Sequence, residues 1–154
     1  MVTRAFFKGL VLLMASMFII SCSGKRPTNL GITDAKFTAC PSSPNCISSD
    51  ARDSNHQIPP YRLIAPADEA WQVTRDLVLK MPRTSIVKQE PGYLHAESSS
   101  ALMGFVDDFE LHLRPAKGII AIRSASRLGY SDFGVNRNRV ETLRSLLISR
   151  GVVR

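Results

Sequence analysis

The chain contains 154 residues, which leaves room for one domain of ordinary size. Lys and Arg number 20 against 13 Asp and Glu, and this balance favours anionic partners such as phospholipid headgroups, lipopolysaccharide or nucleic acid. After residue 21 the sequence has no internal repeat and no apolar run that approaches the roughly 20 residues of a membrane span, which excludes a repeat array and a multispan membrane protein.

Residues 1–21 have the pattern of an export signal. Arg4 and Lys8 give a positive start, and residues 9–20 form an apolar stretch with one plainly polar residue. That stretch is too short to cross a bilayer comfortably. The sequence therefore predicts a leader that carries the chain out of the cytoplasm, so nucleic acid is not expected as a partner.

The leader is followed by a cysteine in a recognisable context. Residues 19–22 are Ile-Ile-Ser-Cys, which is similar to the bacterial lipobox: an aliphatic residue, a tolerant position, a small residue and the cysteine that receives lipid. This pattern predicts lipidation of Cys22 and attachment to a membrane, with an ordinary secretory signal as the alternative. Ser23 stands where aspartate would be the usual signal for retention at the inner membrane. The expected location is therefore the cell envelope, facing the periplasm, with the outer membrane favoured.

Two further cysteines, Cys40 and Cys46, enclose two prolines and an asparagine. In an oxidising envelope, two close cysteines indicate a disulfide, and the turn-forming residues between them allow the sulfurs to meet. Two alternatives stay open: a redox-active or free pair, and a metal site with His56 as a third ligand. The paired Cys-x-x-Cys spacing of zinc sites is missing, so neither a metal nor another cofactor is predicted.

The periodicity of the apolar residues predicts two helices and up to five strands. A first helix has apolar residues at helical spacing from Ala70 to Met81, with Asp68 and Glu69 in its first turn and Pro82 after its end. A second helix is expected to have Asn136 as its N-cap and to stop at Gly151. Strands are predicted at 61–64, 85–89, 93–98, 105–113 and 119–124.

Short turns between the last four strands favour antiparallel pairing. The expected fold is therefore α+β: an antiparallel sheet of about four to five strands with two helices packed on one face. The chain is expected to divide into a signal peptide at 1–21, a lipidated flexible tether at 22–37 and a single α+β domain at 38–154.

Ionisable residues alternate along two of the predicted strands. His95 and Glu97 share one face of their strand, and Asp108, Glu110 and His112 share one face of the next. If these faces coincide, the carboxylates and imidazoles converge as they do in a metal or acid–base site. The solvated face of a half-buried sheet would show the same alternation, so both interpretations stay open.

A second candidate lies between the last strand and the second helix. Residues 123–139 contain four arginines and several small hydroxyl residues at a helix start, a combination that can cradle a phosphate or carboxylate. The residues proposed for anion binding are Arg123, Ser124, Ser126, Arg127, Asn136 and Arg137. Alternatively, these arginines pair with nearby carboxylates, and Asp107, which falls on the apolar face, needs a buried partner such as Arg123.

Four blocks follow one another along the chain: Cys-Pro-Ser-Ser-Pro-Asn-Cys-Ile-Ser-Ser at 40–49, Gly-Tyr-Leu-His-Ala-Glu at 92–97, Phe-Val-Asp-Asp-Phe-Glu at 105–110 and Arg-Ser-Ala-Ser-Arg-Leu-Gly-Tyr-Ser-Asp-Phe-Gly-Val-Asn-Arg at 123–137. At these residues the chain resembles an uncharacterised bacterial family, domain of unknown function 1499, from about residue 40 to residue 147. The family has no established activity, so the resemblance implies no catalytic residue. It marks only the residues of its signature blocks: His95, Glu97, Asp107, Asp108, Glu110, Arg123, Ser124, Arg127, Asp132, Asn136 and Arg137.

Two functions follow from these patterns. The favoured one is a non-catalytic envelope lipoprotein that binds an anionic ligand or an envelope partner through residues 123–139. The alternative is a hydrolytic or metal-assisted envelope enzyme that uses the acidic and histidine residues of the two strands: Glu97, Asp108, Glu110, His95 and His112.

Overall fold

The computed structural model describes residues 24–154, so the predicted signal peptide and Cys22 lie outside the described residues. In chain order the elements are β1 (Ile32–Thr33), β2 (Lys36–Phe37), β3 (Cys46–Ser48), β4 (Tyr61–Arg62), α2 (Ala67–Leu79), β5 (Thr84–Glu90), β6 (Tyr93–Ser99), β7 (Val106–Arg114), the short 3₁₀ helix η2 (Pro115–Lys117), β8 (Ile119–Ser126) and α3 (Val135–Ser149). The expected α+β class is confirmed. Of residues 24–154, no helix is long and apolar enough to cross a bilayer.

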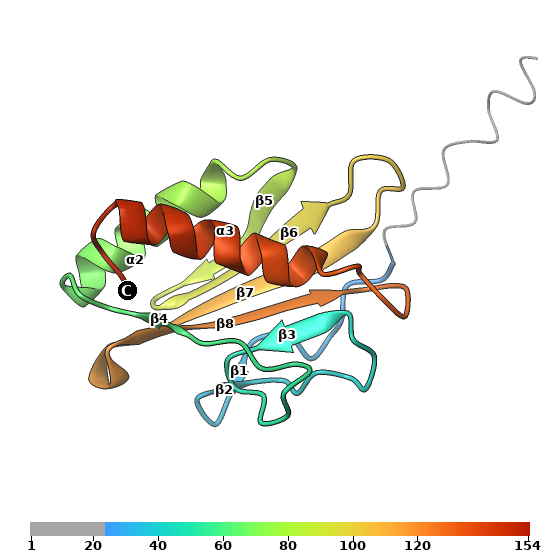
Figure 1. Cartoon of the computed structure of the whole chain (residues 1–154), viewed down its shortest axis with the longest axis horizontal. Coiled ribbons are helices and arrows are strands. Elements are labelled where there is room, and N and C mark those ends of the chain that lie inside the picture. Colours follow the sequence, from blue (N-terminus) through green and yellow to red (C-terminus); the bar gives the residue numbers. More distant parts are fainter. Residues whose placement is uncertain (1–23) are drawn as a thin grey trace, which may run out of the picture.

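The central sheet has six strands in the order β3-β8-β7-β6-β5, and β4 also pairs with β8 (Figure 1). The pairs between these strands are antiparallel, as the short turns predicted. The strand count is higher than expected because β3 adds to the edge of β8, with Cys46 opposite Ala125. A strand of three residues is too short to show a period in the sequence.

Both helices cover the same face of the sheet, as predicted (Figure 1). Alternate residues of β7 and β8, such as Phe109 and Ile122, share one buried cluster with Val140 and Leu143 of α3 and Val78 of α2. Removing this apolar surface from water is the main favourable contribution to folding. The amphipathic pattern of the helices and the alternation of the strands therefore select this layer arrangement.

Helix α3 begins at Val135, two residues earlier than expected, and its N-cap is Gly134 instead of Asn136. Asp132 instead accepts hydrogen bonds from the backbone N–H groups of Gly134 (3.1 Å) and Asn136 (2.8 Å). A carboxylate at this position satisfies N–H groups that have no partner within the helix and interacts favourably with the helix dipole. Asn136 lies inside the helix, where its side chain is fully buried.

The opposite face of the sheet is covered by the beginning of the described chain. The small hairpin of β1 and β2 brings Phe37 against Tyr93 and Ala121, and Phe37 is only 6% exposed. The N–H of Gly31 donates to the carboxylate of Glu110 at 2.7 Å. Residues 24–37, expected as a flexible tether, thus lie against the sheet, because Phe37 gains burial that an extended tether could not give it.

Candidate functional site

The register of the sheet brings the alternating ionisable residues together on one face. His95 of β6 lies opposite Glu110 of β7, and Glu97 lies opposite Asp108. On the other side of β7, Glu110 lies opposite Arg123 of β8. This is the face that the helices leave free, since the helix-facing residues occupy the alternate positions.

These side chains are not a solvated surface. His95 is 3% exposed, Asp108 1% and Glu110 0%. The expectation of a solvated face is therefore wrong, and the reason is that the chain before β3 covers this face. Buried charges need partners, because an isolated charge in a low-dielectric interior is strongly unfavourable.

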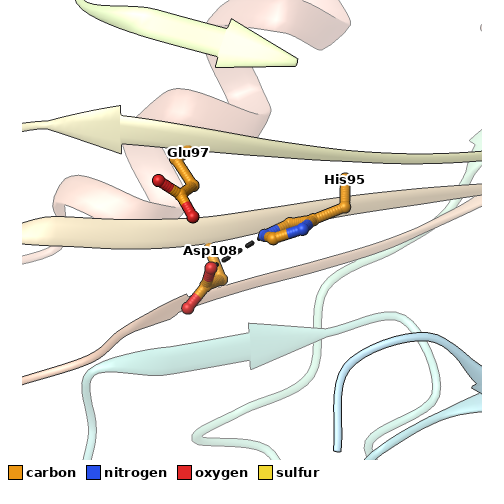
Figure 2. Close-up of side chains that lie close together, drawn as sticks. All are labelled: His95, Glu97 and Asp108. Carbon is orange, nitrogen blue, oxygen red and sulfur yellow. Dashed lines mark hydrogen bonds and ion pairs between the residues drawn. The ribbon is translucent and has the colours of Figure 1, made fainter. Parts of the chain in front are cut away.

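The first network joins β6, β7 and Arg127, the residue after β8, and Figure 2 shows its members His95, Glu97 and Asp108. The Nε2 atom of His95 lies 2.7 Å from Oδ1 of Asp108. Arg127 donates to both oxygens of Asp108, from Nε at 2.9 Å and from Nη2 at 2.7 Å, and it also pairs with Glu97. Arg26, from the covering segment, donates to Glu97 at 2.6 Å. Two guanidinium groups thus neutralise two carboxylates.

The surroundings hold both carboxylates in the ionised form. Burial raises the pKa of Asp108, but hydrogen bonds from Arg127 and His95 outweigh it and keep that pKa below the ordinary value. The same holds for the pKa of Glu97, where hydrogen bonds from Arg26 and Arg127 outweigh burial. A carboxyl group that acts as a general acid near neutral pH needs a raised pKa, so neither residue is tuned for that role.

His95, Glu97 and Asp108 could also offer a metal ion three ligand atoms within 4.8 Å of one another. One imidazole and two carboxylates suit several divalent metals. Arg127, however, already donates to both oxygens of Asp108 and to Glu97. A cation would have to displace this guanidinium, and the positive charge of Arg127 would oppose its binding.

A second network surrounds Glu110. Its carboxylate accepts hydrogen bonds from Tyr93 (2.8 Å), from the N–H of Gly31 (2.7 Å) and from Arg123 (3.1 Å). Arg123 also donates to the carbonyl oxygen of Thr38 at 3.0 Å. Burial and the neighbouring Glu110 raise the pKa of Tyr93, so its hydroxyl remains a donor. This network fastens the covering segment to the sheet.

His112 belongs to a third network and does not join the other candidate catalytic residues. Its Nδ1 accepts a hydrogen bond from Arg114 at 3.1 Å, and its ring meets that of Phe37 edge-on. Arg114 forms two hydrogen bonds of 2.7 Å with Asp50. Burial and Arg114 together lower the pKa of His112, which favours the neutral ring. The five candidates are therefore divided among three structural networks.

The proposed anion-binding residues are divided between the two faces of the sheet. Ser124 and Asn136 meet on the helix side, where their side chains are 2.5 Å apart, and the Asn136 amide donates to Ser126 at 3.0 Å. Arg123 and Arg127 lie on the opposite side, in the networks described above. Arg137 donates to backbone carbonyl oxygens, at 3.1 Å in the closer case. One ligand could not contact all six residues.

The partner of Asp107 is Arg139, at 2.6 Å, and not Arg123. Successive residues of a strand point to opposite faces, which places Arg123 away from Asp107 and the helices. Arg139 comes from the first turns of α3 and also donates to Asn136 at 2.7 Å. The expectation for Asp107 was right in requiring a buried partner and wrong in its identity.

The predicted disulfide between Cys40 and Cys46 is present, with the Cα atoms 5.6 Å apart. The loop that it closes supports the start of α3. The carbonyl oxygen of Asn45 accepts hydrogen bonds from the N–H of Ser126 (3.0 Å) and from the amide of Asn136 (3.1 Å). The disulfide therefore has a structural position in the domain.

An open apolar groove of about 390 Å³ lies between the β6–β7 loop and the β8–α3 segment. Leu102 and Phe133 line it and are 96% and 94% exposed. Sequence reasoning missed this site, although it contained a signal: Leu102 and Phe133 are large apolar residues inside turns, where polar residues are usual. The apolar groove is an open concave surface that faces solvent beside the closed ionic networks.

Of the comparisons with known proteins, one gives a match. No curated protein and no solved structure matches the chain. A family model described as "Protein of unknown function (DUF1499)" matches residues 36–147, which include the three ionic networks' sheet residues, the disulfide and the apolar groove. Because this match covers well over half of the 154 residues, the chain belongs to the DUF1499 family of proteins of unknown function.

Proposed function

We propose that this protein is a bacterial envelope lipoprotein, anchored by lipid on Cys22, whose α+β domain is a non-catalytic binding module. One observation carries the proposal of a binding module. Most ionisable side chains of the family's signature blocks are joined to one another in buried networks, whereas an apolar groove beside them is open. This arrangement suits a module that binds a partner more than a site that performs chemistry.

The enzyme alternative has less support. An acid–base or metal site needs groups that reach a substrate, yet His95, Asp108 and Glu110 are buried beneath the chain that precedes β3. Their hydrogen-bonding capacity is used by Arg127, Arg123, Tyr93 and Gly31. Low pKa values at Asp108 and Glu97 fit stable ion pairs.

The arginine segment is not the contact surface that we propose. Arg123, Arg127 and Arg139 each pair with a buried carboxylate, so an anionic ligand would have to compete with charges that are already in place. The apolar groove is lined mainly by apolar side chains, although the carboxylates of Asp107 and Asp132 also border it. We therefore assign the binding role to the groove.

Replacement of Cys22 tests the anchor. Cys22→Ser should release the protein from membranes into the soluble envelope fraction, because it removes the thiol that would carry the lipid. The measurement is membrane fractionation of cells, together with intact mass of the purified wild type. Soluble wild-type protein without acyl mass would refute the anchor. Cys40→Ser is the matched control, since it removes a sulfur atom that belongs to a disulfide and should leave the protein in the membrane.

A further inference from the structure

Large apolar side chains gather at the opening of the apolar groove. We call Leu102, Met103, Leu128 and Phe133 the groove rim. All four line the groove, and their exposed fractions are 96%, 60%, 44% and 94%. Tyr130 follows in the same segment and is 76% exposed. A soluble domain seldom exposes such a cluster without an interaction partner.

The start of the described chain lies beside this rim. A Cβ atom at Gly24 would lie 3.0 Å from Cγ of Leu128, so the Gly24 backbone is in contact with the rim. Figure 1 shows the beginning of the described chain at the end of the sheet where the β6–β7 loop and the β8–α3 segment lie. Cys22 precedes Gly24 by two residues, and two residues span at most about 7 Å. A lipid on Cys22 must therefore enter its membrane close to the groove rim.

The residues next to Gly24 have the charge that a phospholipid surface attracts. Lys25 and Arg26 are both exposed, and the side chain of Arg26 stays 55% exposed although it pairs with Glu97. Basic residues beside an anchor are attracted to anionic headgroups. Exposed Leu, Met and Phe side chains with a neighbouring Tyr match the composition of segments that enter the interface of a bilayer.

We propose that the groove rim inserts into the phospholipid bilayer that holds the lipid of Cys22. This inference rests on the proposed function, because it takes the anchor at Cys22 as its starting point, and it names the partner of the apolar groove. The domain then lies on the membrane in a fixed orientation, with the rim and the anchor as two adjacent contacts. Two weak contacts at one edge reinforce each other, as they do in proteins that combine a lipid with a second membrane signal.

Site-specific fluorescence tests the orientation. The lipidated protein is reconstituted in vesicles of phosphatidylethanolamine and phosphatidylglycerol with brominated acyl chains, which quench tryptophan on contact. Phe133→Trp reports on the rim and Ile148→Trp is the matched control. Ile148 is also exposed, but it lies about 20 Å from the rim along α3. Trp71, the natural tryptophan, also fluoresces, so the emission of the unsubstituted protein is measured separately and subtracted.

We expect a blue-shifted and quenched emission for Phe133→Trp and an unchanged emission for Ile148→Trp. Equal emission of the two variants in vesicles would overturn the proposal. A blue shift without quenching would also overturn it, because it would indicate that a second copy of the chain covers the groove. Neither result would contradict the lipid anchor, because the acyl mass and co-sedimentation with vesicles measure the anchor separately.

A second measurement does not depend on lipidation. The mature Cys22→Ser chain, from residue 22, contains every described residue and can be titrated with the same vesicles. Leu102→Ser should weaken its binding about tenfold, since burial of one large apolar side chain contributes roughly that factor. Ile148→Ser should leave the binding unchanged. Equal binding of the two variants would contradict insertion of the rim even if the anchor itself proved wrong.

Discussion

At the scale of single residues, Arg127 joins parts of the chain that are distant in sequence. It follows the end of β8, yet it pairs with Asp108 of β7 and Glu97 of β6. Its side chain is only 6% exposed, and its carboxylate partners raise its pKa, so it remains charged. Removal of one member of a buried ion pair leaves the other member charged and unpaired, which is why such positions are sensitive to substitution.

Arg127→Met should lower the free energy of unfolding by about 3 kcal/mol, because Asp108 and Glu97 lose a shared partner. Arg137→Met is the matched control. Arg137 donates to backbone carbonyl oxygens at a partly exposed position, and its loss should cost less than about 1 kcal/mol. Urea denaturation at pH 7 measures both values. Similar losses in the two variants would show that the network at Arg127 is not a structural support.

At the scale of elements, the β1–β2 hairpin and its flanks act as a cover for the polar face of the sheet. Phe37 is the apolar anchor of this cover, between Tyr93 and Ala121, and Arg114 lies over its ring. The N–H of Phe37 donates to Asp50 at 3.0 Å. A short hairpin has little stability of its own, so the cover depends on these contacts with the sheet.

Phe37→Ala should lower the free energy of unfolding by about 3 kcal/mol, since it removes a buried aromatic ring. It should also speed hydrogen exchange at Gly31, whose N–H is held by Glu110. Phe133→Ala makes the same chemical change at a residue that is 94% exposed and should change stability by less than about 0.5 kcal/mol. If exchange at Gly31 stayed slow in Phe37→Ala, another contact would have to anchor the cover.

At the scale of the whole molecule, several ion pairs make the free energy of unfolding depend on pH in the same direction. The pKa values of Asp50, Glu97 and Asp108 are all below the ordinary values of 3.8 for Asp and 4.5 for Glu. In each case burial alone would raise the pKa, and hydrogen bonds from arginines outweigh it. Carboxylates of low native pKa bind protons more readily in the unfolded chain, so these groups stabilise the fold above pH 4.5 and lose that contribution as the pH falls.

The free energy of unfolding should therefore fall as the pH is lowered from about 5 to 3, and urea denaturation at several pH values measures it. Asp50→Asn should make this fall shallower, because it removes one carboxylate whose native pKa is low. Asp34→Asn is the control, at an exposed position of the β1–β2 turn. A slope that Asp50→Asn leaves unchanged would show that the pair with Arg114 contributes nothing to acid stability.

Local sequence patterns determined the fold class of this protein. Apolar residues at helical spacing placed α2 and α3, and the alternating side-chain directions along β6 and β7 placed His95, Glu97, Asp108 and Glu110 on one face. The close pair of Cys40 and Cys46 likewise indicated the disulfide. These features depend on residues that are near one another in the chain, and their period or spacing is visible without a structure.

The tertiary structure alone decided whether the ionisable residues were open or buried. The bonds of Arg26 to Glu97, Gly31 to Glu110 and Arg139 to Asp107 join residues between 32 and 79 positions apart. No period or motif encodes such a pairing, because it depends on which segments meet when the chain packs. The same physical reason applies to the apolar groove. Leu102 and Phe133 belong to separate turns, and only the arrangement of the strands brings them into one groove with Leu128, which lies beside Gly24.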